Sequence, residues 1–372
     1  EQTLEAEAMD FRYSDEHDMV RRMARDFADK EIAPYARAWE EKHVFPPATL
    51  NRMRAAGLLT LGIPAAYGGA GLDHVSKNLV TEELARGDAG IATSMVVSTL
   101  LGSHPVWLAA TPGQKKWWYG LEAEGSLTAL CLGGEVSCHR RGDEYILKGR
   151  HQSVNNGAGA GLYTVFASLH NRPGARGTCT FMVDRNSDGI GIESGSPPGV
   201  RSSESATVSY DDVRVPARNL LGKEGDGVKI ALRTQSMARV TAAAVAVGIA
   251  QATFEAVVQY SLQRYQFGKP IFELPEIHLR LVDMAQSIEN GRLSHLAAAQ
   301  MLDDGLAADE AIYQTRGWCG DIALRATRDA LRICGGPGYG EAFPVEKYYR
   351  DALVLRNWRE QPWLKKHLSP AI

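Results

Sequence analysis

The sequence predicts an α+β protein of three parts: a helical domain, a β-domain and a second helical domain, in chain order. Three observations support this prediction. Apolar residues recur at helical spacing before about residue 125, short β-rich runs follow, and long helical stripes return after about residue 227. A chain of 372 residues also exceeds the usual size of a single hydrophobic core. We therefore predict domains at residues 1–125, 126–226 and 227–372.

The N-terminal segment has the signals of a capped, half-buried helix. Ser14 suits the N-cap, because its hydroxyl can accept a hydrogen bond from a free backbone N–H group of the first turn. Val20, Met23 and Phe27 follow at helical spacing and predict the buried stripe of this helix. The stretch 91–101 is nearly uncharged, so we expect it to be buried.

The middle segment contains short runs of β-forming residues. The runs at 145–147, 163–166 and 180–183 are rich in aromatic and β-branched residues, and Gly, Asn, Asp and Pro stand between them. Their spacing of roughly 10–20 residues predicts an antiparallel barrel or sandwich.

The last segment returns to helical spacing for most of its length. Ile277, Leu281, Met284 and Ile288 form one apolar stripe. The stretch 240–252 is rich in alanine, which allows helices to pack closely. Long helices with short breaks predict an antiparallel bundle.

Composition and generic motifs narrow the function classes. The formal net charge is −3 without a basic block, which argues against a nucleic-acid partner. No run of about 18 apolar residues occurs, so we expect no membrane span. The five cysteines include no CxxC pair, which is typical of buried thiols in a reducing cytoplasm. The GxGxxG, P-loop, HExxH and GxSxG motifs are absent from the sequence, which disfavours classical nucleotide folds, zinc hydrolases and serine hydrolases.

Less generic motifs carry more information. In chain order they are Tyr-Gly-Gly-Ala-Gly-Leu-Asp at 67–73, Glu-Glu-Leu-Ala-Arg-Gly-Asp-Ala at 82–89, Asp-Val-Arg-Val-Pro at 212–216, Arg-Tyr-Gln-Phe-Gly-Lys-Pro at 264–270, and Gly-Gly-Pro-Gly-Tyr at 335–339 followed by the helix at 344–352. Each alone is weak evidence. Together, and in this order, they resemble the acyl-CoA dehydrogenase superfamily from about residue 10 to residue 352.

The resemblance implies an N-terminal helical domain, a β-barrel-like domain and a C-terminal four-helix bundle, assembled as a homodimer or homotetramer. It also implies FAD, held between subunits. In the family, an arginine pairs with the FAD diphosphate and a Gly-Gly turn lets the backbone approach the ADP half. A guanidinium suits phosphate oxygens and glycine permits close approach. The residues that correspond to this half of the site are Arg264, Gln266, Phe267, Arg332, Gly335 and Gly336.

The half of the site that faces the flavin ring departs from the family. The family motif Thr-Glu-Pro-x-x-Gly-Ser-Asp is missing, and a serine replaces the tryptophan that covers the ring, which removes a stacking surface worth roughly 1 kcal/mol. An asparagine remains that can hydrogen-bond flavin N5. The residues that correspond to this half are Leu130, Leu132, Gly133, Ser153, Val154 and Asn155.

The catalytic base is also displaced. The family's glutamate falls on Arg359 in this sequence, and the alternative base position, just before the substrate-side arginine Arg239, is Ala238. Loss of a general base lowers a rate by roughly 10²–10⁴-fold. Glu360, one residue beyond the family position, is the remaining candidate.

Three functions fit this pattern. The first is an FAD-dependent oxidoreductase acting on an acyl thioester of CoA or of a carrier protein, with a relocated base. The second is a non-oxidative enzyme on the same scaffold, which eliminates, cyclises or cleaves an acyl thioester. The third is a non-catalytic subunit that completes the FAD site of a paralogue in a heteromer. We favour the first, because the arginine and the glycines that serve FAD are present together.

Overall fold

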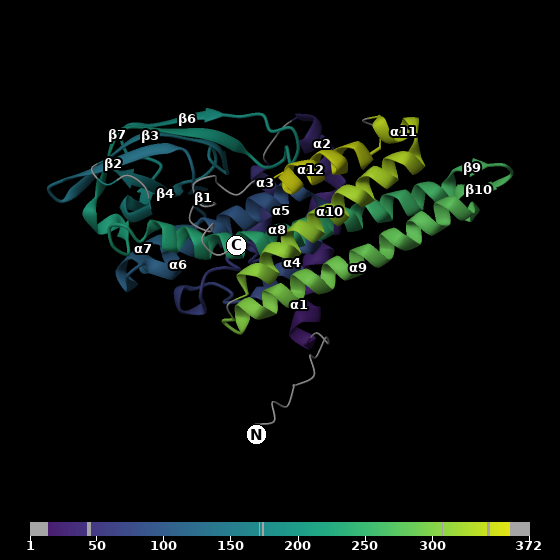
Figure 1. Ribbon diagram of the computed structural model, residues 1–372, viewed down its shortest axis with the longest axis horizontal. Helices are drawn as coiled ribbons and strands as arrows, with labels where there is room; N and C mark the ends of the chain where they lie inside the picture. Colours follow the sequence, from purple (N-terminus) through teal and green to yellow (C-terminus); the bar gives the residue numbers. More distant parts are fainter. Residues whose placement is uncertain are drawn as a thin grey trace, which may run out of the picture.

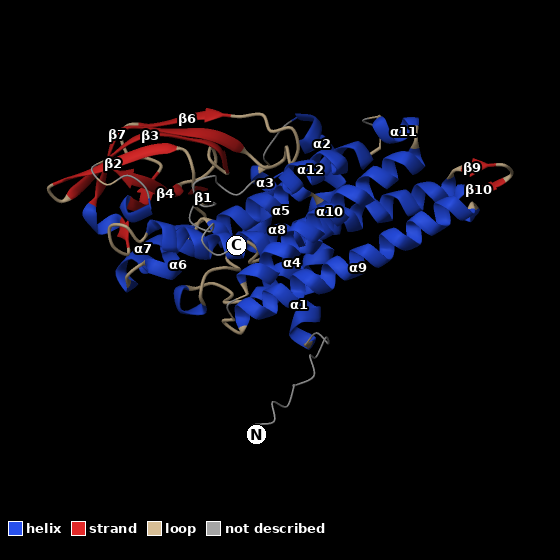
Figure 2. Ribbon diagram, viewed as in Figure 1, coloured by secondary structure: helices blue, strands red, loops and turns tan. Residues whose placement is uncertain are grey.

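The structure, a computed structural model, describes residues 14–42, 46–170, 172, 175–306, 308–340 and 343–357. Long helices run side by side along the long axis of the molecule, and the sheet lies at one end of them (Figures 1 and 2). A large apolar core lies among the helices, and residues of the sheet form a second one. Two smaller apolar clusters lie where two helices of the N-terminal part meet the sheet and between one helix of that part and three of the C-terminal part. The predicted three-part fold is confirmed.

The N-terminal part is helical throughout. Its elements are α1 (Asp15–Phe27), η1 (Ala28–Ile32), α2 (Ala33–Lys42), α3 (Pro47–Ala55), η2 (Ala65–Tyr67), α4 (His74–Gly87), α5 (Ala89–Val96), η3 (Val97–Leu101), α6 (His104–Ala109) and α7 (Pro112–Ala123). The predicted cap is present, because the Ser14 hydroxyl accepts a 3.1 Å hydrogen bond from the backbone N–H of His17.

The buried stripe of α1 differs from the prediction. Val20 and Ala24 are buried, whereas the Met23 side chain is 38% exposed and Phe27 is only half-buried. A helix repeats every 3.6 residues, so the line through Val20 and Ala24 leaves Met23 beside the contact with α4 rather than in it. The prediction of a buried Met23 is therefore wrong. The uncharged stretch 91–101 is buried along its whole length, as predicted.

The middle part is a single eight-stranded sheet. Its strands are β1 (Thr128–Cys131), β2 (Glu135–Arg141), β3 (Glu144–Asn155), β4 (Leu162–Leu169), β5 (Thr178–Asp184), β6 (Ile190–Ser194), β7 (Ser205–Pro216) and β8 (Leu220–Leu221). Their order is β6-β7-β3-β2-β4-β5-β8, and β1 pairs with β4 outside this path.

Pairing in the sheet is mixed rather than purely antiparallel, because β1 and β2 both run parallel to β4. These two strands behave as one interrupted strand. Cys131 lies opposite Val165 and Ser137 lies opposite Ser168, so six steps along β1 and β2 match three along β4. Two glycines between the strands, at φ 83° and 103°, absorb the extra length, since glycine adopts such angles without strain.

The C-terminal part is a bundle of long helices. Its elements are α8 (Gly227–Gln263), β9 (Tyr265–Gln266), β10 (Lys269–Pro270), η6 (Ile271–Glu273), α9 (Pro275–Asp303), α10 (Asp309–Cys334), α11 (Gly336–Tyr339) and α12 (Val345–Asn357). The short helices η4 (Ala175–Gly177) before β5 and η5 (Ala217–Asn219) before β8 belong to the middle part. Helices α8, α9, α10 and α12 pack together, as the predicted four-helix bundle requires.

Small residues allow the close packing of α8. A Cβ atom at Gly248 would lie 2.4 Å from the carbonyl oxygen of Glu82 on α4, so only glycine fits at this crossing. The predicted stripe on α9 is confirmed, since Leu281, Met284 and Ile288 are buried and Ile277 packs against the same core.

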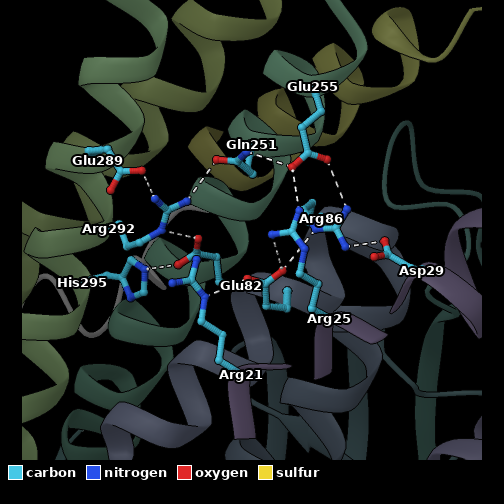
Figure 3. A network of polar contacts seen from close by, with 11 residues as sticks. Arg21, Arg25, Asp29, Glu82, Arg86, Gln251, Glu255, Glu289, Arg292 and His295 are labelled. Carbon is cyan, nitrogen blue, oxygen red and sulfur yellow. Dashed lines mark hydrogen bonds and ion pairs between the residues drawn. The ribbon is translucent and has the colours of Figure 1, made fainter. Parts of the chain in front are cut away.

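A chain of polar contacts crosses the helical core (Figure 3). The carboxylate of Glu82 lies 2.7 Å from Arg292 Nε and 2.9 Å from His295 Nε2, both on α9. Arg292 also donates to Gln251 on α8, which in turn donates to Glu255. The contacts extend to the first helices through Arg21, Arg25, Asp29, Glu83 and Arg86. Three layers of helices are thus joined by charge as well as by apolar packing.

Two described helical stretches, 89–109 and 227–263, have the length and hydropathy of membrane-crossing helices. The most apolar windows of these stretches are 83% and 78% buried inside the protein, as expected for core helices.

Candidate active site

A cavity of about 540 Å³ lies between the sheet and the helices, and it collects the residues predicted to face the flavin ring. Its walls come from β1, β3, β7, α5 with η3, the first turns of α8, the loop 195–200 and the last turns of α12. The predicted residues that line it together are Leu130, Leu132, Ser153, Val154, Asn155 and Ala238.

A β-bulge brings the residues of β3 to this cavity. His151 lies opposite Val208 and Val154 lies opposite Ala206, so β3 carries one extra residue over this interval. Ser153 takes up the excess at φ 54°, which is strained for a residue with a side chain. A regular strand would send successive side chains to opposite faces. The bulge instead lets four consecutive residues, 152–155, border the cavity.

The interruption between β1 and β2 forms a second wall. Leu132 lines the cavity, and Gly133 follows it in the turn at φ 83° without being one of the lining residues. A Cβ atom at Gly134 would lie 2.7 Å from the carbonyl oxygen of Arg150, so this turn packs tightly against β3. The predicted Gly133 therefore shapes the wall rather than facing the cavity.

The described lining of the cavity contains no ionisable side chain. Its polar groups are neutral and include Thr93, Gln152, Asn155 and Gln235. His151 is adjacent in the chain but is buried, and burial lowers its pKa to about 4 because the imidazolium form is poorly solvated there. Among the residues described, none that lines this cavity can act as a general base.

The last turns of helix α12 reach the edge of the cavity. Val354 and Leu355 line the cavity, and α12 ends at Asn357. Arg359 and Glu360 lie outside the described residues. Ala238, which the resemblance places at the alternative base position, lines the cavity and is 8% exposed.

Arg239, the predicted substrate-side residue, does not line the cavity. It is 6% exposed, and its guanidinium carbon lies 5.5 Å from the centre of the Tyr313 ring on α10. This cation–π geometry holds Arg239 within the helical bundle.

The residues predicted to bind the FAD diphosphate lie at the other end of the bundle. Arg264 follows the last residue of α8, and Phe267 with Gly268 forms a two-residue hairpin turn at φ 53° and 78°. Positive φ at both positions is typical of a type I′ turn. The Phe267 side chain is 89% exposed at the tip, and Gln266 is exposed beside it. The Arg264 side chain is exposed and forms no ion pair with any residue that the structure describes.

The glycine turn lies at the same end of the molecule (Figure 1). A Cβ atom at Gly335 or Gly336 would meet nothing within 4 Å, so their own chain does not require glycine for space. Gly335 has φ 61°, which does favour glycine. Arg332 is exposed on the last turn of α10 and lies 3.3 Å from Asp329. This open, glycine-lined backbone can be approached from outside.

The two halves of the predicted site are therefore separated within one chain. Ala238 borders the cavity and Arg264 lies 26 residues further along α8, which corresponds to roughly 40 Å at 1.5 Å per residue. A single dinucleotide cannot reach both places in one chain. The sequence had no signal for Thr93, Gln235 or the loop 195–200 as cavity walls, because they meet it only through tertiary packing.

Two models of known protein domains match the helical parts of this chain. Residues 14–126 match the model of the acyl-CoA dehydrogenase N-terminal domain, and residues 225–359 match that of the acyl-CoA dehydrogenase C-terminal domain. An acyl-CoA dehydrogenase of Bacillus subtilis is 35% identical over 350 residues, which cover 91% of this chain and 92% of that protein. The chain belongs to the acyl-CoA dehydrogenase family, and with this the expectations of an FAD flavoenzyme acting on CH–CH donors are confirmed at the level of the family.

Solved structures also resemble this chain over nearly its whole length. The butyryl-CoA dehydrogenase of Megasphaera elsdenii superposes with a TM-score of 0.92 at 30% identity, covering 97% of this chain and 99% of that one. A chain solved in work on the electron transferring flavoprotein of Acidaminococcus fermentans gives a TM-score of 0.93 at 31% identity, covering 97% and 98%. The similarity thus includes the β-domain and the bundle together.

Proposed function

We propose that the protein is an FAD-dependent dehydrogenase of acyl-CoA thioesters with an uncharged acyl group, and that it uses a base outside the usual family positions. The observation that carries this proposal is the cavity in which the residues at the family's ring-facing positions meet. Bound FAD supplies a hydride acceptor, and the chain's own residues bind and orient the substrate beside it.

The residues fit the flavin in both halves of the site. The cavity is bounded by neutral polar side chains and apolar ones, which suits a planar, uncharged ring system. The Asn155 amide can donate a hydrogen bond to a ring nitrogen, and Ser153 leaves open the space that a tryptophan would fill. At the far end, the exposed Arg264 guanidinium and the open Gly335–Gly336 backbone suit a diphosphate.

The substrate class follows from the charge of the cavity. The described lining carries no cation that would neutralise a terminal carboxylate and no carboxylate that would pair with an amine. Burying an unpaired charge there would be strongly unfavourable. We therefore expect butyryl-CoA or a similar neutral thioester to react and glutaryl-CoA to react far more slowly.

Glu360 is the proposed base. It is the first carboxylate in the sequence after Leu355, the last residue of α12 that lines the cavity. Its role would be to take the α-proton of the thioester while the β-hydrogen leaves as hydride.

A second copy of the chain completes the proposed site. The roughly 40 Å between the cavity and Arg264 requires that the diphosphate-binding end come from another subunit. The exposed Phe267 and Tyr265, at 89% and 60%, supply apolar area for such a contact. We propose a homo-oligomer, with the tetramer that the family resemblance implies. The cytoplasm remains the expected compartment, since the five cysteines are buried and unpaired.

The visible absorption spectrum of the purified protein tests the proposal. We expect flavin bands near one equivalent per chain, and their bleaching when butyryl-CoA is added without oxygen. A colourless protein that rejects added FAD would overturn the redox assignment. A yellow protein that processes thioester without bleaching would instead support the non-oxidative alternative. Flavin that appears only with a co-purified paralogue would support the alternative of a non-catalytic subunit in a heteromer. Bleaching by an acyl carrier protein thioester but not by the CoA thioester would show that the carrier protein, and not CoA, delivers the acyl group.

A further inference from the structure

Three walls of the cavity meet at one buried lysine. Lys347, on the first turn of α12, has a side chain that is only 7% exposed. Its ammonium nitrogen lies 2.6 Å from Asp351 Oδ2 on the same helix and 3.0 Å from Asp88 Oδ2 before α5. Both carboxylates are fully buried. These buried charges therefore interact with one another rather than with water, with one ammonium group facing two carboxylates.

Asp88 fixes the helical wall of the cavity. Its Oδ1 accepts a 2.9 Å hydrogen bond from the backbone N–H of Ile91 and so caps α5. Thr93 and Val97, on α5 and η3, line the cavity. The same Oδ1 accepts a hydrogen bond from the Ser202 hydroxyl, which ties the loop before β7 to this helix end.

Asp351 fixes the loop wall. Its Oδ1 accepts a 2.5 Å hydrogen bond from the backbone N–H of Val200, a lining residue at φ 48°. A β-branched residue at this angle is strained, so the surrounding contacts must hold it there. A Cβ atom at Gly199 would lie 2.6 Å from the carbonyl oxygen of Arg350, which shows how closely this loop packs on α12.

Helix α12 itself is the third wall. Lys347 and Asp351 are one turn apart, and Val354 and Leu355 on the next turn border the cavity. Burial lowers the pKa of Lys347, but Asp351 and Asp88 raise it more, so that it lies above the ordinary lysine value and the side chain stays charged. Removal of this charge would leave two buried carboxylates facing each other.

We propose that Lys347, through Asp88 and Asp351, is a positioning residue that keeps α5, the loop 195–203 and α12 at the spacing that substrate binding requires. This inference rests on the proposed function, because it concerns the same cavity. It assigns no role in proton or hydride transfer to Lys347, which does not line the cavity.

The kinetic test compares Lys347→Met with Lys347→Arg. A displaced wall weakens substrate binding more than it slows the chemical step, so we expect Lys347→Met to raise KM for butyryl-CoA by about tenfold or more with a smaller change in kcat. Lys347→Arg keeps the charge and should recover most of the loss. The control is Lys30→Met, which removes an exposed lysine paired with Asp26 at 3.3 Å. A Lys347→Met enzyme with wild-type KM would overturn the proposal.

Hydrogen exchange tests, without measuring activity, whether Lys347, Asp88 and Asp351 hold the cavity walls. Its result therefore separates failure of this inference from failure of the proposed function. Asp351→Asn keeps an acceptor for the Val200 N–H but loses the ion pair, whereas Asp351→Ala loses both. We expect the Val200 amide to exchange about tenfold faster or more in Asp351→Ala than in the wild type, with Asp351→Asn in between. Unchanged protection of this amide in Asp351→Ala would refute the positioning role of these residues even if the protein were colourless and inactive. If Lys347→Met does not fold, the two Asp351 variants decide the question.

Discussion

Glu122, on α7, is a buried carboxyl group with little to stabilise its charge. Its side chain is 4% exposed, and its Oε1 accepts a 2.6 Å hydrogen bond from the Ser103 hydroxyl. The other oxygen has no hydrogen-bond partner in the described part of the chain. Burial raises its pKa to about 8, against the weaker effects of Ser103 and Trp118. A neutral carboxylic acid therefore sits inside the helical domain at neutral pH.

The raised pKa of Glu122 makes the free energy of unfolding depend on pH in a defined direction. Between pH 4.5, the ordinary value, and about 8, the folded protein holds a proton that the unfolded chain has released, so the free energy of unfolding falls as pH rises. The contribution is on the order of 4 kcal/mol across this window. In Glu122→Gln, urea unfolding measured from pH 5 to pH 8 should show a smaller decline than in the wild type. Glu124→Gln, at the exposed end of the same helix, is the control and should keep the wild-type slope. Equal slopes in Glu122→Gln and the wild type would contradict a neutral Glu122.

A second residue-scale prediction concerns the base. If Glu360 takes the α-proton, Glu360→Gln should slow flavin reduction by butyryl-CoA by roughly 10²–10⁴-fold, because the neutral amide cannot accept the proton. The flavin spectrum of the resting protein should not change. Stopped-flow absorbance measures both. Arg359→Gln is the matched control from the neighbouring position, and a larger loss in that variant than in Glu360→Gln would show that Glu360 is not the base.

Among the secondary-structure elements, α4 depends on charge contacts with α9 as well as on close packing against α8. Glu82 on α4 is fully buried, and burial alone would raise its pKa. The hydrogen bond and charge of His295, with those of Arg292, outweigh burial and lower the pKa to about 2. The ion pairs of Figure 3 therefore depend on a carboxylate that stays ionised well into acid.

The folded pKa of Glu82 lies below its ordinary value of 4.5, so its stabilising effect is complete above about pH 4.5 and is lost as pH falls toward 2. The effect is on the order of 3 kcal/mol. Glu82→Gln should therefore be less stable than the wild type at pH 7, and the difference should shrink in acid. Urea unfolding at pH 7 and pH 3 measures it. Glu276→Gln, at the exposed start of α9, should match the wild type within about 0.5 kcal/mol. If Glu82→Gln lost the same free energy of unfolding at both pH values, the loss could not come from the ionised Glu82 carboxylate.

At the scale of the whole molecule, the separation of the two half-sites predicts complementation between subunits. Arg264→Glu places a negative charge where the diphosphate is proposed to bind, and Ala238→Phe fills the cavity with a ring. Each variant alone should therefore lack flavin that butyryl-CoA can bleach. In a mixed oligomer, an intact cavity can meet an intact diphosphate end. Random pairing should restore about a quarter of the sites.

Co-expression with two affinity tags, followed by titration of bleachable flavin, measures this recovery. Mixing the separately purified variants without subunit exchange provides the control and should give no recovery. No bleachable flavin in verified mixed oligomers would mean that both half-sites must lie in the same chain, which contradicts the assembly proposed here.

Much of the fold could be predicted from local sequence patterns. Ser14 capped a helix, the stripe of Leu281, Met284 and Ile288 faced the core, and the runs in the middle segment became strands, because helical and strand periodicity need only neighbouring residues. The prediction of a buried Met23 was wrong, because the position of α4 decides which side of α1 is buried, and the spacing of residues within α1 does not. The parallel pairing of β1 and β2 with β4 likewise depends on partners that are distant in the chain.

The sequence by itself determined the three-part order and the family motifs, and it predicted the residues of the two half-sites. Only the tertiary structure decided that the predicted half-sites lie far apart along the bundle, that a bulge at Ser153 exposes four consecutive residues to one cavity, and that Lys347 contacts carboxylates of two of its walls. Caps, turns and apolar stripes arise from interactions between neighbours in the chain. A cavity arises where elements far apart in the chain meet, so its shape and charge depend on the register and packing of all of them.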